Sequence, residues 1–128
     1  PYTVRLAKAI GARITALHVT APYETVALGG LASFLVGDEY TKRASINATV
    51  VLDRLQRVAQ DANVLVGTFQ VEHAHPWQAI IETAKEQKAD LILMSSHGRR
   101  GIAGILLGSE TKKVLTHTTT PVLVWRGV

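Results

Sequence analysis

The sequence predicts an α/β fold with an open, doubly wound parallel sheet and helices on both of its faces. Short apolar segments alternate along the chain with longer segments that carry a helical apolar stripe. This alternation is typical of parallel strands joined by right-handed helical crossovers. The apolar segment 91–94 also ends at a glycine-rich loop, which is where open sheets of this class bind ligands. The chain has 128 residues, so we expect a single domain over residues 1–128.

The composition excludes several classes of protein. Hydrophobic residues make up 47% of the chain, too many for a disordered protein. Cysteine is absent, which excludes disulfides and cysteine-bound metal centres, and we expect a cytoplasmic protein. The net charge is +4, but the two Trp, three Tyr and two Phe are scattered, so we expect no nucleic-acid partner. The longest uncharged stretch, Thr25–Gly37, is too short and glycine-broken to span a membrane.

The first half of the chain predicts two helices and two strands. The expected elements are a helix over Pro1–Ile10 that ends at Gly11, a strand over Ile14–Val19, a helix over Glu39–Ala62 with Asp38 as its N-cap, and a strand over Thr68–His73. The connection Thr20–Asp38 is either a lid or partner-binding flap, or a short helix packed on the core. His73 and His75 would share one face, but no third ligand is evident, so we expect no metal.

The second half predicts the same alternation. A helix begins at Pro76, and its apolar face is formed by Trp77, Ile80, Ile81 and Ala84. A buried strand covers Leu91–Met94, and the last strand covers Pro121–Arg126. Between them a helix covers Ser109–His117, with Ser109 as N-cap and with Val114 and Leu115 pointing inward. Proline at the start of the last strand indicates an edge position. An exposed apolar edge needs a partner, and a second copy of the same strand is the simplest one. We therefore expect a homodimer through Pro121–Arg126.

The segment between the third predicted strand and the last predicted helix has the composition of a phosphate-binding loop. Glycines lie at residues 98, 101, 104 and 108, and Arg99 and Arg100 add positive charge. Glycine lets backbone N–H groups approach an anion, and a helix start offers unpaired N–H groups. Neither G-x-x-x-x-G-K-[ST] nor G-x-G-x-x-G is present, so a Walker A loop and a dinucleotide fingerprint are not supported. The alternative is a glycine-rich turn that only packs strand on helix.

This loop resembles that of the universal stress protein family. Nucleotide-binding members of the family carry Gly-x-x-Gly, nine residues, then Gly-Ser/Thr between their fourth strand and last helix. Here Gly98 matches the second glycine and Gly108-Ser109 matches the closing pair, while Ser95 stands where the family has its first glycine. Serine resists a positive φ, so nucleotide binding is weakened if that position requires one. The resemblance covers nearly the whole chain.

The resemblance implies a Rossmann-like sheet of five strands and a bound ATP or related adenine nucleotide, with or without Mg. The family's first strand has no counterpart after residue 1. Either residues upstream have been omitted, which we expect, or the chain lacks this central strand. The residues that would bind the nucleotide are Val19 near the adenine, Met94 and Ser95 near the ribose, and His97, Gly98, Arg99, Gly108, Ser109, Glu110 and Thr111 around the phosphates. We interpret His97 as a hydrogen bonder that fixes the loop. Glu110 would repel phosphates unless it points outward.

The leading hypothesis is therefore an ATP-binding stress-response or regulatory module rather than an enzyme, with weak hydrolysis at most. The sequence offers no paired carboxylates at strand ends and no nucleophile–base pair. The alternative is a universal stress protein without nucleotide that acts as an interaction module through Thr20–Asp38. An enzyme of the adenine-nucleotide α-hydrolase type is not supported, because the chain has no SGGxDS loop.

Overall fold

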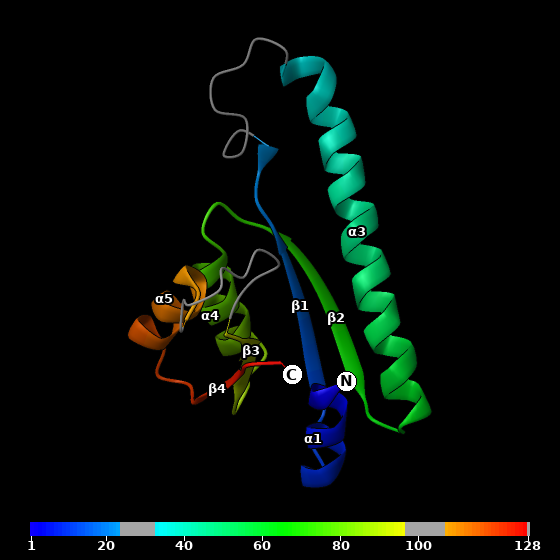
Figure 1. The fold of residues 1–128 in the computed structure, drawn as a ribbon, viewed down its shortest axis with the longest axis vertical. Coiled ribbons are helices and arrows are strands. Elements are labelled where there is room, and N and C mark those ends of the chain that lie inside the picture. Colours follow the sequence, from blue (N-terminus) through cyan, green and yellow to red (C-terminus); the bar gives the residue numbers. More distant parts are fainter. Residues whose placement is uncertain (24–32, 97–106, 128) are drawn as a thin grey trace. The chain divides into compact units, whose positions relative to one another are not determined.

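The computed structural model describes residues 1–23, 33–96 and 107–127 (Figure 1). The chain divides into two compact units, Pro1–His75 and Pro76–Val128, and each is described by itself. In chain order the elements are α1 (Tyr2–Ile10), β1 (Ile14–Thr20), α3 (Ser33–Asp61), β2 (Val66–Glu72), α4 (Pro76–Glu86), β3 (Ile92–Ser95), α5 (Ser109–His117) and β4 (Val122–Trp125). Helices and strands therefore alternate as predicted.

The first unit is a parallel strand pair covered by helix α3. Strands β1 and β2 pair from Ile14 with Val66 to Thr20 with Glu72, which confirms the predicted parallel arrangement. Figure 1 shows the long helix α3 running beside both strands. The core of this unit joins α1, the C-terminal part of α3 and the turn into β2. Its buried members are Val4, Ala7, Ala59 and Val64.

The end of α1 agrees with the sequence prediction. Gly11 follows the last helical residue with φ 65° and ψ 29°, the left-handed conformation that glycine adopts without strain. The N–H of Ala12 donates to the carbonyl of Ala7 at 2.9 Å and closes the helix end. The chain thereby turns directly from α1 into β1.

Helix α3 begins earlier than predicted. It begins at Ser33, so Asp38 lies inside the helix and is not its N-cap. Gly37 lies inside the helix, and a Cβ at this position would lie 3.3 Å from Cδ1 of Tyr23. The Tyr23 ring packs on Tyr40 with a centroid separation of 5.4 Å, and the Tyr40 hydroxyl donates to the carbonyl of Ala21. Glycine in this helix thus makes room for an aromatic ring. The part of Thr20–Asp38 at residues 24–32 lies outside the described residues.

The second unit repeats the parallel pairing. Strands β3 and β4 pair from Ile92 with Val122 to Ser95 with Trp125. Strand β3 begins at Ile92, one residue later than predicted, and Leu91 before it is 39% exposed. Helices α4 and α5 contact each other, and the core residues are Ala84, Ile92 and Val114, with Trp77, Ile80, Ala89, Met94 and Val122 packed around them.

Of the two residues of α5 that we predicted to point inward, one is buried and one is exposed. Val114 is fully buried, but Leu115 is 42% exposed. Adjacent helical residues point about 100° apart, and the buried cluster that includes Val114 does not include Leu115. Within the described residues, no helix combines the length and the apolar character needed to cross a membrane.

Candidate functional site

The ends of the glycine-rich segment are fixed to each other through the backbone. Ser96 follows β3 and is 2% exposed. Its carbonyl accepts the N–H of Gly108 at 2.6 Å, and its own N–H donates to the carbonyl of Trp125 at 2.8 Å. The start of α5 is therefore held at the carboxyl end of β3. This is the position where the sequence predicted a ligand site.

The start of α5 provides backbone N–H donors, although the N-cap is one residue earlier than expected. The N-cap is Gly108, with φ −65° and ψ 158°, and Ser109 is the first helical residue rather than the cap. The first helical hydrogen bond runs from the N–H of Lys112 to the Gly108 carbonyl at 3.0 Å. The preceding N–H groups, those of Ser109, Glu110 and Thr111, have no acceptor within an α-helix. The Gly108 N–H, which we expected to donate to a phosphate, instead donates to the Ser96 carbonyl.

Thr111 connects α5 to β3. Its side chain is buried, at 3% residue exposure, and its hydroxyl donates to the carbonyl of Ser95 at 3.0 Å. Thr111 lies three residues before Val114 and shares its inward face. The hydroxyl proton that the family resemblance directs to a phosphate is thus used within the protein. The backbone N–H of Thr111 remains part of the helix start.

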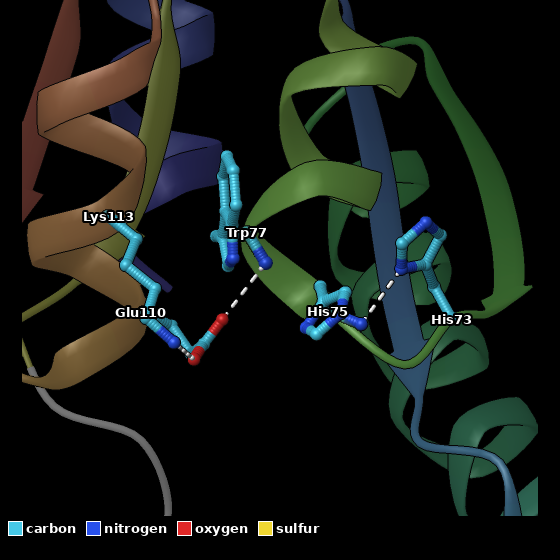
Figure 2. A network of polar contacts seen from close by, with 5 residues as sticks. All are labelled: His73, His75, Trp77, Glu110 and Lys113. Carbon is cyan, nitrogen blue, oxygen red and sulfur yellow. Dashed lines mark hydrogen bonds and ion pairs between the residues drawn. The ribbon is translucent and has the colours of Figure 1, made fainter.

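Glu110 is directed to helix α4 (Figure 2). Its Oε2 accepts the backbone N–H of Trp77 at 3.0 Å, and its Oε1 accepts from Nζ of Lys113 at 3.3 Å. Trp77 lies in the first turn of α4, where N–H groups lack helical acceptors and negative charge is favourable. The negative charge of Glu110, which we expected to repel phosphates, is therefore bound by the start of α4 and by Lys113. No sequence pattern links residues 77 and 110, so this contact could not be predicted.

Trp77 also contacts the other end of α5. Its ring stacks on the His117 ring with a centroid separation of 4.6 Å and an interplanar angle of 29°. One residue at the start of α4 thus contacts the first and the last turn of α5. These contacts fix the direction of α5 and of the N–H groups at its start. The sequence placed Trp77 only on an apolar face.

The remaining predicted site residues are placed as follows. Ser95 is exposed at the end of β3, and it is not among the described residues with a positive φ, so its side chain causes no backbone strain there. Met94 is half-buried against the core of the second unit. Val19 is half-buried in the first unit, paired with Val71. His97, Gly98 and Arg99 lie outside the described residues.

The two histidines after β2 cap a turn. The N–H of His75 donates to Nδ1 of His73 at 2.8 Å, and the two rings are 6.1 Å apart (Figure 2). The N–H of His73 donates to the carbonyl of Thr20. Across residues 1–23, 33–96 and 107–127, no cluster of three or more His, Cys, Asp or Glu side chains could hold a metal ion.

Parallel strands joined by helices, with one helix beginning at the carboxyl end of a strand, define an α/β protein of the open-sheet class. Within that class the assignment is specific. The model of the universal stress protein family matches residues 2–126, and the chain belongs to this family.

Individual relatives agree with this assignment. Universal stress protein MJ0531 of Methanocaldococcus jannaschii is 31% identical over 123 residues, which are 96% of this chain and 70% of the relative. The structure of UspA from Lactobacillus plantarum matches with a TM-score of 0.82 at 24% identity, over 98% of this chain and 85% of that one. A universal stress protein solved in complex with cAMP matches with a TM-score of 0.64 at 26% identity, over 97% and 81% of the two chains.

Proposed function

We propose that this chain is an adenine-nucleotide-binding module of a stress response, with ATP as its ligand and with the phosphates at the start of α5. The observation that carries the proposal is the row of N–H groups at Ser109–Thr111, held at the carboxyl end of β3. A helix start with free N–H groups is a general anion-binding feature. A family relative solved with cAMP supports an adenine nucleotide as the anion.

The charges around this helix start favour a phosphate. Glu110, the acidic residue of the first turn, has both carboxylate oxygens engaged, one by Trp77 and one by Lys113. Lys112 is exposed in the same turn. The helix dipole adds partial positive charge at this end. A phosphate placed here would meet little repulsion.

The remaining contacts belong to the same proposal. The exposed hydroxyl of Ser109 would add a donor to a phosphate, and Ser95 would lie near the ribose. Met94 is proposed near the ribose, and His97, Gly98 and Arg99 are proposed as further phosphate-binding residues. Mg²⁺ would accompany ATP by binding its phosphates. The module binds nucleotide with weak hydrolysis at most, and we propose that it acts in the cytoplasm.

We also propose that the protein forms a homodimer through β4. The carbonyls of Pro121 and Trp125 both face β3, because they accept the N–H groups of Ile92 and Ser96. Backbone groups alternate along a strand, so those of Val124 face the opposite edge. Val124→Pro should remove an outward N–H without breaking the pairing with β3. Loss of dimer mass in sedimentation supports the strand interface, and an unchanged mass contradicts it.

Titration calorimetry tests the nucleotide proposal. Wild-type protein should bind Mg-ATP saturably, and comparison with ATP alone, cAMP and adenosine should show how much affinity the phosphates contribute. Adenosine should bind more weakly than ATP because it lacks the anion that the helix start recognises. The absence of heat above background at millimolar nucleotide would contradict the proposal.

A further inference from the structure

The outer face of α3 carries a stripe of exposed residues with a regular spacing. The residues follow one another at steps of four, three, four, three and four, which keeps them on one side of a helix. They are Glu39, Arg43, Ile46, Val50, Asp53 and Arg57. Ile46 is 58% exposed and Val50 is 61% exposed, so two neighbouring aliphatic side chains lie in the middle of this stripe without cover from the rest of the unit.

This stripe lies opposite the face that α3 packs against its own sheet. Ala48 and Ala59 are fully buried, and Leu52 is 9% exposed. At about 100° per residue, Ile46 and Val50 each point roughly 160° away from Ala48. The stripe is therefore a separate surface with a different role from packing within the first unit.

The order of side chains along the stripe is self-complementary when it is reversed. From its N-terminal end the stripe reads acid, base, apolar, apolar, acid, base. A second copy running in the opposite direction places Glu39 against Arg57 of the partner subunit, Arg43 against Asp53 of the partner subunit, and Ile46 against Val50 of the partner subunit. Every charge then meets an opposite charge. A parallel arrangement would place each charge against an identical one.

We propose that the outer face of α3 is a homodimer interface in which two copies pack antiparallel about a two-fold axis that passes between Ile46 and Val50. The alternating four- and three-residue spacing is that of a coiled-coil seam, and antiparallel seams form such cross-paired layers. Residues pair reciprocally, as a two-fold interface requires. The apolar layers at the centre exclude water, and the charged layers at the ends set direction and register.

The ion pair in the single chain fits this arrangement, and the small apolar part of the stripe limits the strength of the dimer. Glu39 and Arg43 already form an ion pair at 2.7 Å, with their side chains 60% and 76% exposed, so they keep free surface for a further partner. Each copy contributes only two aliphatic side chains to the seam, so the dimer should be weak and concentration-dependent. The interface uses a surface different from β4, and it goes beyond the proposed nucleotide function.

Cysteine cross-linking tests the direction and the register directly. The chain contains no cysteine, so single cysteines can be introduced as Ile46→Cys and as Val50→Cys. A mixture of the two variants should form a disulfide between positions 46 and 50. Each variant alone should cross-link less, because identical positions are displaced by about 6 Å along the axis. Lys85→Cys on α4 is the control. Absent cross-links, or cross-links no more frequent in the mixture than in the single variants, would overturn the proposal.

Sedimentation of charge variants in the Val124→Pro background, in which the β4 interface is removed, gives an independent test. Arg43→Glu should raise the dissociation constant of this interface roughly tenfold, because two like-charge contacts replace two attractive ones. The double variant Arg43→Glu with Asp53→Arg restores complementarity in the antiparallel direction and should recover the dimer. Glu86→Lys on α4 is the matched surface control, and circular dichroism verifies folding. A double variant no tighter than the single variant would overturn the proposal. Val124→Pro distinguishes the interfaces, because it should leave the 46–50 cross-link intact.

Discussion

The carboxylate of Glu110 accepts the backbone N–H of Trp77 at 3.0 Å, so the first turn of α5 caps the first turn of α4. This relationship places a residue of the candidate phosphate site in a structural role. It also engages the negative charge of Glu110, because one carboxylate oxygen accepts from the Trp77 N–H and the other accepts from Nζ of Lys113. The same contact supports the fold and leaves the helix start suited to an anion.

Glu110→Ala should lower the free energy of unfolding by about 1 kcal/mol, since it removes a charged cap from α4. Urea denaturation measures the change. Glu110→Gln keeps an acceptor oxygen and should lose less. Glu86→Ala, near the exposed C-terminal end of α4, is the control and should change stability little. Equal stability of Glu110→Ala and wild type would show that the cap contributes nothing.

Thr111→Val should cost about 1 kcal/mol of stability while leaving nucleotide affinity within about twofold. The Thr111 side chain is buried and its hydroxyl donates to the Ser95 carbonyl, so the substitution leaves a partly buried acceptor without this donor. Thr116→Val removes an exposed hydroxyl that donates to the Lys112 carbonyl, and it is the matched control. A large loss of affinity in folded Thr111→Val protein would show that the hydroxyl reaches the phosphate after all.

Ser95→Gly should leave nucleotide affinity unchanged and reduce stability by roughly 0.5–1 kcal/mol. Ser95 lies at the end of β3 without a positive φ, so the serine side chain imposes no strain that glycine would relieve. Calorimetry and thermal unfolding measure the two effects. A marked gain in affinity would mean that the bound state needs a conformation that serine resists.

Gly11→Ala should destabilise the protein by about 1 kcal/mol, because alanine is strained at a φ of 65°. A Cβ there meets no atom within 4 Å, so strain and not crowding would cause the loss. Gly67→Ala in β2 is the control, since its Cβ would make only an ordinary contact with Phe69 at 3.7 Å. Similar behaviour of the two variants would contradict this explanation.

Much of the fold could be predicted from local patterns. Gly11 ends α1, Pro76 begins α4, and the apolar runs form strands, because each of these features depends on residues close in sequence. The parallel pairing follows from the alternation of strands and helices. The predicted start of α3 was wrong, because the helix begins at Ser33 and continues through Asp38. The close approach of the Tyr23 ring to Gly37 depends on tertiary packing and cannot be read from the sequence. The prediction that Leu115 points inward was wrong because its side chain lies about 100° around the helix from Val114, outside the buried cluster.

The elements that flank the glycine-rich segment were predicted more accurately than the contacts at its ends. The glycine-rich segment does connect β3 to α5, but its Gly108 amide and Thr111 hydroxyl bind carbonyls at the end of β3. Such pairings depend on how a helix start meets a strand end, and residue spacing alone does not determine them. The contact between Glu110 and Trp77 joins residues 33 positions apart.

The most direct test of the nucleotide proposal is the ATP affinity of Ser109→Pro beside that of Ser109→Ala. Proline is tolerated at the first helical position, and the extended conformation of Gly108 is compatible with a following proline, so the variant deletes one N–H and keeps the helix. Ser109→Ala deletes only the hydroxyl. We predict that Ser109→Pro binds Mg-ATP about tenfold more weakly than Ser109→Ala, as expected for a hydrogen bond to a charged group. Equal affinities in the two variants would contradict phosphate binding at the start of α5.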